Sequence, residues 1–363
     1  MGRGCGFVEG LASGTLPHHH AWPPGHMEST MADPTGKIVF ASGNVGDYDL
    51  WTLDLVSGAI RQLTTGTNWN DKPSWSPDGS KVVFTSDRNG GGQDIFCVSA
   101  EGGEPVALTN LKLWADSPVF SPDGQRIAFT SNEAGNHDVW VMDADGGNRT
   151  QVTVDEGSDK HVRWAPDGKG LYFSSDRMDG DADIWHIDLA TGTTRQLNED
   201  LGADITPVPS PDGSLIAFCS NRQLREDPNN PNSDRDKDIW MMRADGTMAV
   251  RLTNNQGADY CPCWSPDGTH LLYTANDESN VCHLRMVDIS ELLAAYGQND
   301  FEAVKKAANR LRHTKVDYER SAMAAEIGAE RHAIYFTAWM PDSWVRRIYP
   351  SGYFGKERNP HWV

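Results

Sequence analysis

The sequence predicts an all-β fold, a seven-bladed β-propeller of four-stranded antiparallel blades. The main observation is a short phrase, most often Trp-Ser-Pro-Asp-Gly, whose aspartates stand at positions 78, 123, 167, 212 and 267. The steps between these positions are 45, 44, 45 and 55 residues, which is the length of a blade of four short strands. A second observation is that similar strand patterns follow every copy, so the repeat belongs to the structure as well as to the sequence.

Each repeat begins with a tight turn and continues as three further strands. Proline pre-sets φ in the Pro-Asp-Gly turn, and glycine takes the position with positive φ. An apolar strand follows, such as residues 81–86, and then a polar loop. The next strand opens with Asp and an apolar-aromatic pair, as in residues 94–96, and a second glycine turn leads to a Leu-Thr or Val-Thr strand. Short β-branched and aromatic runs between such turns are typical of strands.

The blade count depends on both ends of the chain. Second strands begin near residues 37, 81, 126, 170, 215, 270 and 332, the last in a degenerate unit over 316–350. The first unit lacks its innermost strand, and residues 359–363 resemble the opening of one. We therefore expect the C-terminal strand to pair into the N-terminal blade and close the ring, because closure removes exposed sheet edges. Six blades with an irregular appendage is the alternative.

The repeat places one propeller domain at residues 33–363. Residues 1–32 are rich in Gly, Pro and His, and we interpret them as a disordered or artefactual N-terminal extension. A polar loop insertion is expected at 223–237 and a helical insertion at 290–312, with Ser290 capping the first helix and Asn299 or Asp300 the second. No secretory signal is visible, which favours the cytoplasm over the periplasm, and no apolar run is long enough to span a membrane.

The charge of the chain limits its partners. The net charge is −19, so the chain would be repelled by nucleic acid and by anionic membranes. We expect a monomer whose partner is a protein or peptide.

Carboxylates stand just before the innermost strand of successive blades. In a propeller these connections gather around one mouth of the central channel, together with the loops between second and third strands. The predicted ligand-binding residues are the carboxylates with neighbouring aromatic and guanidinium groups: Asp71, Asp116, Asp159, Asp204, Asp259, Trp69, Trp114, Tyr260, Arg88, Arg177 and Arg222. Such a set suits a cation, a basic peptide segment or a sugar.

A structural role for the same aspartates remains open. Aspartate at a strand start often accepts backbone hydrogen bonds in a turn. The register also shifts: Asp71 and Asp116 lie four residues before the aromatic residue of the phrase, whereas Asp159, Asp204 and Asp259 lie five residues before the equivalent position.

The repeated motifs resemble those of the TolB-type propeller family. The resemblance rests on Trp-Ser-Pro-Asp-Gly, on second strands ending in Ser-Asp-Arg at 86–88 and 175–177, on Asp-Ile-Trp and on Leu-Thr, and it covers residues 37 to 363. It implies a propeller, but members include protein-binding TolB, the propellers of prolyl-oligopeptidase-like peptidases and oligogalacturonate lyases. The fold alone does not choose among these functions.

Departures from these members favour a binding function. The Gly-x-Ser-x-Gly turn of the peptidases is missing, and the histidines form no metal-ligating or acid-base constellation. We therefore predict a non-catalytic, TolB-like scaffold that binds a protein or peptide at the acidic loop face, with no catalytic residues. A saccharide-active enzyme of the oligogalacturonate-lyase type is the alternative. No cofactor or metal is predicted; the 227–238 loop has oxygen ligands for Ca²⁺ but lacks the EF-hand spacing, so we prefer a solvated loop.

Overall fold

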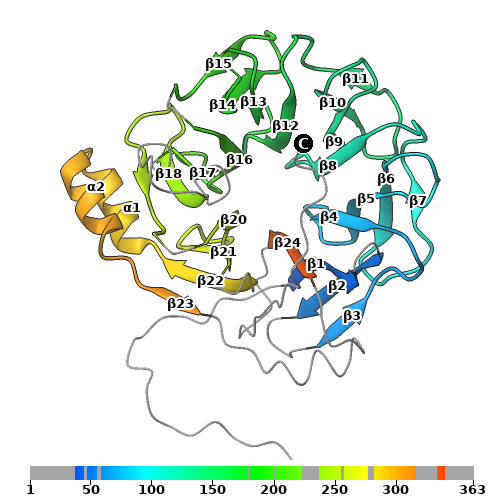
Figure 1. Ribbon diagram of the computed structural model, residues 1–363, viewed down its shortest axis with the longest axis horizontal. Helices are drawn as coiled ribbons and strands as arrows, with labels where there is room; N and C mark the ends of the chain where they lie inside the picture. Colours follow the sequence, from blue (N-terminus) through cyan, green and yellow to red (C-terminus); the bar gives the residue numbers. More distant parts are fainter. Residues whose placement is uncertain are drawn as a thin grey trace, which may run out of the picture. The chain divides into compact units, whose positions relative to one another are not determined.

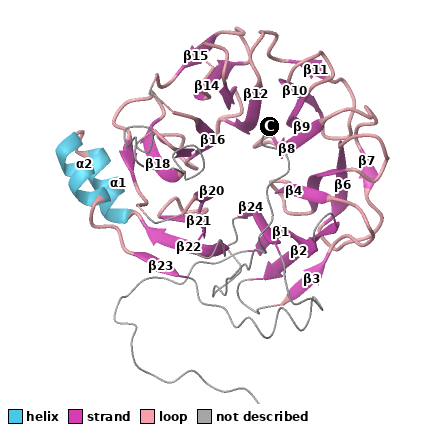
Figure 2. Cartoon of the chain, in the orientation of Figure 1, coloured by secondary structure: helices cyan, strands magenta, loops and turns pink. Residues whose placement is uncertain are grey.

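The computed structural model describes residues 37–44, 47–54, 59–178, 180–199, 202–222, 237–254, 257–276, 282–315 and 333–339. In these residues the chain forms six four-stranded antiparallel sheets, arranged as blades around a centre (Figure 1). Helices α1 (Ser290–Gly297) and α2 (Phe301–Ala308) lie on the outside of this ring, as Figure 2 shows. The predicted extension over residues 1–32 and the loop over 223–236 lie outside the described residues.

Each of the six blades runs from an innermost strand near the centre to an outermost strand. Blade 1 contains, in this order, β24 (Ala333–Trp339), β1 (Lys37–Asn44), β2 (Asp47–Asp54) and β3 (Ile60–Gln62), and blade 2 contains β4 (Asn70–Trp75), β5 (Lys81–Ser86), β6 (Asp94–Ser99) and β7 (Val106–Ala107). Blade 3 contains β8 (Ala115–Phe120), β9 (Arg126–Ser131), β10 (Asp138–Asp143) and β11 (Thr150–Gln151). Blade 4 contains β12 (Asp159–Trp164), β13 (Gly170–Ser175), β14 (Asp183–Asp188) and β15 (Thr194–Gln196). Blade 5 contains β16 (Asp204–Pro209), β17 (Leu215–Ser220), β18 (Asp238–Arg243) and β19 (Val250–Arg251), and blade 6 contains β20 (Asp259–Trp264), β21 (His270–Asn276), β22 (Cys282–Asp288) and β23 (His313–Lys315).

The prediction of seven blades is wrong, and the six-bladed alternative holds for the described chain. The strand taken as the second strand of a seventh blade is β24, which pairs with β1 and is the innermost strand of blade 1. It lies beside β20 on one side and β4 on the other, so it closes the ring. The sequence of β24 is a largely apolar run like those of the second strands, whereas the inner strand β4 is mostly polar, so only the pairing shows that β24 is an inner strand. Residues 359–363, which we expected to close the ring, lie outside the described residues.

The Pro-Asp-Gly phrase forms the hairpin turn between the first two strands of a blade. In blade 2 the Gly79 amide donates to the carbonyl of Ser76 at 2.8 Å, and Gly79 has φ of +67°. The Ser76 hydroxyl donates to Asp78 Oδ1 at 2.6 Å. These bonds are local, so the phrase needs no contact from another blade to form its turn.

In blades 2 to 5 the third strand opens with an aspartate, and in blades 2 and 5 this aspartate binds the threonine that follows the fourth strand. In blade 2, Thr109 Oγ1 donates to Asp94 Oδ1 at 2.7 Å and accepts from the amide of Ile95 at 2.9 Å. The same two bonds join Asp238, Thr253 and Ile239 in blade 5. The carboxylate is therefore used inside the blade.

One buried aromatic residue on the second strand marks each blade. These residues are between 0% and 3% exposed and occupy one repeat position: Phe40, Phe84, Phe129, Phe173, Phe218 and Tyr273. Five of them, all but Phe40, belong to apolar clusters that join neighbouring sheets, where burial of a large side chain contributes about 1.5 to 3 kcal/mol. Six such residues correspond to six blades.

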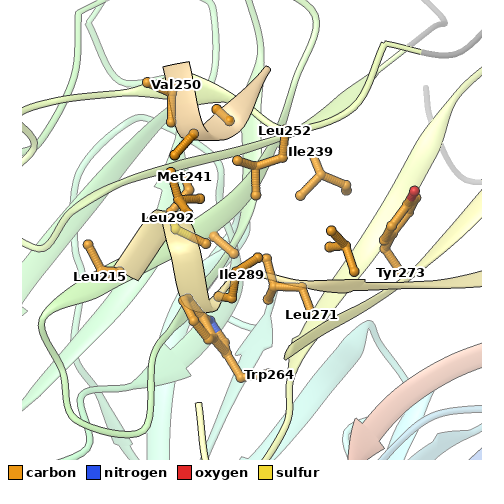
Figure 3. Packing of buried hydrophobic residues seen from close by; sticks show 14 of the residues in the cluster. Leu215, Ile239, Met241, Val250, Leu252, Trp264, Leu271, Tyr273, Ile289 and Leu292 are labelled. Atoms are coloured by element: carbon orange, nitrogen blue, oxygen red, sulfur yellow. The ribbon is translucent and has the colours of Figure 1, made fainter. Parts of the chain in front are cut away.

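The helical insertion extends the core of the last two blades. Helices α1 (Ser290–Gly297) and α2 (Phe301–Ala308) connect β22 to β23. Figure 3 shows Leu292 of α1 packed with Met241 and other apolar residues of blades 5 and 6. Asp300 caps α2, accepting from the amides of Glu302 and Ala303, whereas Ser290 is the first residue of α1 and not its expected cap.

Candidate functional site at the starts of the inner strands

The strand register divides the predicted arc of carboxylates into two sets. Asp159, Asp204 and Asp259 are the first residues of their inner strands, and the first two pair with the last serine of the second strand. Asp71 and Asp116 are second residues, paired with Thr85 and Thr130. The one-residue shift seen in the sequence is therefore a difference in position, and the two sets have different neighbours.

Two members of the first set, Asp159 and Asp204, bind the predicted arginines within their own blades. In blade 4, Arg177 Nη2 donates to both carboxylate oxygens of Asp159 at 2.8 Å, and Arg177 Nε donates to Ser175 Oγ at 2.8 Å. In blade 5, Arg222 donates in the same way to Asp204 at 2.5 Å and to Ser220.

Blade 2 repeats this arrangement without the ion pair. There Arg88 Nη2 donates to the amide oxygen of Asn70 at 2.7 Å, because Asn70 occupies the first strand position. In the described residues this guanidinium therefore occurs in three blades, and its partner is an acid in two of them.

Each of these guanidiniums also lies over aromatic rings of its own blade. The Cζ atom of Arg177 is 4.6 Å from the ring centroid of Trp185, and that of Arg222 is 4.7 Å from Trp240. Arg88 lies 5.1 Å from the centroid of Phe96. Burial raises the pKa of Asp159, although Ser175 and Arg177 oppose the shift. These contacts hold the second-to-third-strand loop against the start of the inner strand.

The second set forms a cluster between blades 2 and 3. The ammonium of Lys72 on β4 forms an ion pair with the carboxylate of Asp116 on β8, and Asp116 Oδ1 accepts from the amide of Ser117 at 2.6 Å. Asp71 Oδ1 accepts from the amide of Lys72 at 2.7 Å. Burial raises the pKa of Asp71. Burial acts on Asp116 as well, but Lys72 overcomes it and lowers the pKa of that carboxyl.

The predicted aromatic residues lie beside both sets. The amide of Trp69 donates to Asp87 Oδ1 at 2.8 Å, and the amide of Trp114 donates to Asn132 Oδ1 at 2.9 Å. Tyr260 is the second residue of β20, the position that Asp71 and Asp116 hold in β4 and β8.

The fifth aspartate, Asp259, is fully buried, and its amide donates to the carbonyl of Lys237 at 2.6 Å.

Sequence reasoning missed a bulge in the inner strands. The register shifts at the third residue of each inner strand from β4 to β20. The bulge residues have φ between 50° and 57°, a left-handed conformation that is rare for residues with a side chain: Lys72, Ser117, His161, Thr206 and Cys261. Proline follows four of the five in the sequence, and this was the signal for an irregular edge strand.

Exposed apolar side chains gather on the loops that precede or adjoin the inner strands. Among the described residues four large apolar side chains are exposed, and three of them lie in these loops: Leu113 at 46%, Val154 at 79% and Met178 at 68%. Val154 and Met178 are each next to a member of the Asp155–Arg177 ion pair, whose atoms are 2.7 Å apart. We call the loops of blades 2 to 4 on this side the loop face. The fourth exposed residue, Val106, lies on the outermost strand of blade 2.

The described residues hold neither a metal-ligand cluster nor a membrane helix. No three His, Cys, Asp or Glu side chains in this part of the chain converge to hold a metal ion. None of the described helices has the length and apolar character needed to cross a bilayer.

A closed ring of four-stranded blades with a distinct loop face defines a β-propeller. The family model of the TolB beta propeller domain matches residues 7–112 and 106–223, more than half of the chain. The protein therefore belongs to the TolB β-propeller family.

Individual relatives are distant. An uncharacterized protein of Agrobacterium fabrum is 31% identical over 81 residues, which are 22% of this chain and 25% of that protein. The match thus spans about a quarter of the length of this relative. TolB from Acinetobacter baumannii has a TM-score of 0.59 at 24% identity, covering 70% of this chain and 62% of that one. The putative TolB from Agrobacterium tumefaciens has a TM-score of 0.57 at 18% identity, covering 85% and 99%. At these identities the structural likeness shows the fold alone.

Proposed function

We propose that the protein is a non-catalytic propeller that binds a protein or peptide partner through the loop face of blades 2 to 4. The observation that carries this proposal is the concentration of exposed apolar side chains there. Single exposed apolar residues are ordinary, but Val154 and Met178 flank one ion pair and lie on adjoining loops. Apolar anchors within a polar rim are typical of protein interfaces.

The charge of the loop face indicates which chemical groups the proposed partner presents. Val154 is followed by Asp155 and the exposed Glu156, and Met178 lies two residues after Asp176. Arg177 does not attract an acidic partner, because its guanidinium is engaged by Asp155 and Asp159. The proposed partner therefore presents an apolar side chain flanked by Lys or Arg. Asp71, Asp116, Trp69 and Trp114 at the inner-strand starts belong to the proposed binding surface, whereas Tyr260 lies on β20 of blade 6 and does not.

The test uses the fourth exposed apolar residue as a matched control. A partner is first identified by crosslinking to the wild-type protein, and its affinity is then measured for the double variant Val154→Ser, Met178→Ser and for Val106→Ser. We expect at least about a tenfold loss for the double variant, because truncation of interface anchors typically has an effect of this size or larger. Val106→Ser should bind as the wild type does. Equal affinity for all three proteins would contradict the proposed surface.

The charge of the surface has its own test. Asp155→Asn with Glu156→Gln should lower the association rate and make it less sensitive to salt, since exposed charges act mainly on encounter. An unchanged salt dependence would contradict the proposal that acidic residues of the loop face attract the partner.

A further inference from the structure

Blade 3 carries a glutamate at the position where blades 2, 4 and 5 carry an arginine. Arg88, Arg177 and Arg222 each stand two residues after the last serine of the second strand, and Glu133 stands two residues after Ser131. The amide of Glu133 donates to Ser131 Oγ at 3.2 Å. The amides of Arg88 and Arg222 donate to the equivalent serines at 3.3 and 3.1 Å. The backbone therefore repeats in blade 3, and the charge of the side chain is reversed.

The acceptor for the arginine is also missing from blade 3. The first residue of the inner strand, which pairs with the same serine, is Asn70, Asp159 or Asp204 in the three blades with an arginine. In blade 3 this residue is Ala115. Ala115 has no side-chain oxygen, so blade 3 lacks both members of the contact that the other blades repeat.

The aromatic residue on the third strand is less covered in blade 3. Trp140 pairs with Phe129 in the register in which Trp185 pairs with Phe173. Trp185 and Trp240 lie under their arginines and are 8% and 7% exposed, whereas Trp140 is only partly buried. No lysine or arginine of the described chain lies over the Trp140 ring in the way that Arg126 lies over Trp164, at 4.6 Å.

Glu133 uses one carboxylate oxygen and has another without a partner. Its Oε1 accepts from Arg149 Nη2 at 2.9 Å. Its Oε2 is buried and has no hydrogen-bond partner among the residues that the structure describes. An unpaired buried acceptor lowers stability, so a donor supplied by a ligand would be stabilising here. The Glu133 side chain is 28% exposed, which leaves a direction from which a ligand can approach.

We propose that blade 3 binds an arginine side chain of the partner, placed over Trp140 as the arginines of blades 2, 4 and 5 lie over their own third-strand aromatic residues. The guanidinium stacks on the indole and donates to Glu133 Oε2. Arginine on tryptophan is a favourable cation–π pair, and a hydrogen bond between two charged groups is stronger than one between neutral groups.

The site adjoins the exposed apolar residues of the loop face. Asn136, in the loop that carries Glu133, donates from Nδ2 to the carbonyl of Asp155 at 2.9 Å, and Asp155 follows Val154. One peptide can therefore place an apolar side chain at Val154 and an arginine in blade 3. This inference rests on the proposed function, because it specifies one residue of the proposed partner.

A small arginine derivative tests the site without the partner. The probe is N-acetylarginine N-methylamide, titrated against the indole Nε1–H resonance of Trp140, which is identified by its absence in Trp140→Phe. We expect a saturable shift, and none with the citrulline derivative, which has nearly the same shape but no charge. The resonance of Trp185 should stay in place, because Arg177 already covers that ring at 4.6 Å.

The variants compare two glutamates that each pair with an arginine. Glu133→Gln should weaken binding of the probe about tenfold, since it removes the charge of the acceptor and keeps its shape. Glu291→Gln is the matched control: Glu291 accepts from Arg310 at 3.2 Å on helix α1, outside blade 6, and its loss should leave binding unchanged. The double variant Ala115→Asp, Glu133→Arg installs the residues of blades 4 and 5 and should abolish binding. If that variant does not fold, Glu133→Gln decides.

The outcomes separate this proposal from the proposed function. No saturable shift, equal binding of the citrulline derivative, or an equal loss in Glu133→Gln and Glu291→Gln would overturn the arginine site. Binding of free arginine at least about tenfold tighter than the probe would overturn its use by a partner, because the ligand would then be the amino acid. The double variant Val154→Ser, Met178→Ser should bind the probe as the wild type does, even where it no longer binds the partner. The two proposals therefore fail separately.

Discussion

Two ion pairs at the starts of the inner strands differ in what they connect. Asp159 and Arg177 lie within one blade, the carboxylate is fully buried, and the arrangement recurs in blade 5. Asp116 and Lys72 join two blades, and 42% of the lysine side chain remains exposed. The repeated pair therefore stabilises the blade, whereas the pair between blades 2 and 3 is partly open to water.

The largest expected effect comes from breaking a repeated pair. Arg222→Ala leaves the fully buried Asp204 without its guanidinium and should lower the free energy of unfolding by about 3 to 5 kcal/mol. Arg88→Ala removes the same aromatic contacts but leaves a neutral partner, Asn70, so it should lose only about 1 to 2 kcal/mol. Urea unfolding of both variants measures the difference. Equal losses would mean that the aromatic contacts, and not the carboxylates, dominate.

A smaller change in stability is expected at His161 on the inner strand β12, and this change depends on pH. Burial, with Lys72 nearby, lowers the pKa of His161 from 6.5 to about 3. Below about pH 6.5 the unfolded chain therefore takes up a proton that the folded protein does not, and stability falls as the pH drops toward 3. Between pH 7 and pH 5 the wild type should lose about 1 to 2 kcal/mol more than His161→Gln.

Urea midpoints of the two proteins at both pH values check this sign. Other groups titrate over the same range, and the comparison with the variant removes their contribution. A variant that lost as much stability as the wild type would show that His161 is protonated in the folded protein.

The smallest expected changes in stability are those of substitutions in the Pro-Asp-Gly turn and in the inner-strand bulge. Gly213 in the Pro-Asp-Gly turn of blade 5 has φ of +73°, and an added Cβ would make only an ordinary contact with Pro166. Gly213→Ala should therefore lose about 1 kcal/mol from backbone strain alone. Thr206→Gly in the bulge should gain about 0.5 kcal/mol, because relief of strain is partly offset by the freedom of glycine in the unfolded chain. Thermal unfolding separates the two signs, and a loss in Thr206→Gly would assign a stabilising contact to its side chain.

The candidate site was predictable in composition but not in arrangement. The sequence indicated Asp159, Asp204, Arg177 and Arg222 as neighbours on one face, and the structure brings them together as pairs. It did not indicate Lys72, because no local pattern shows that this lysine of blade 2 pairs with Asp116 of blade 3. The exposed apolar residues of the loop face were also missed, since exposure depends on what packs against a loop.

The sequence by itself determined the strands, the turns and the length of a blade. Pro-Asp-Gly and the Asp-Thr bonds act within one repeat, so residues near one another in the chain were sufficient. Only the tertiary structure decided that the blades number six and that Ala333–Trp339 closes the ring. It also decided which aspartates are used inside a blade and which one pairs with a neighbouring blade. These outcomes depend on strand pairing between distant segments. The apolar sequence of a strand does not indicate which strand it pairs with.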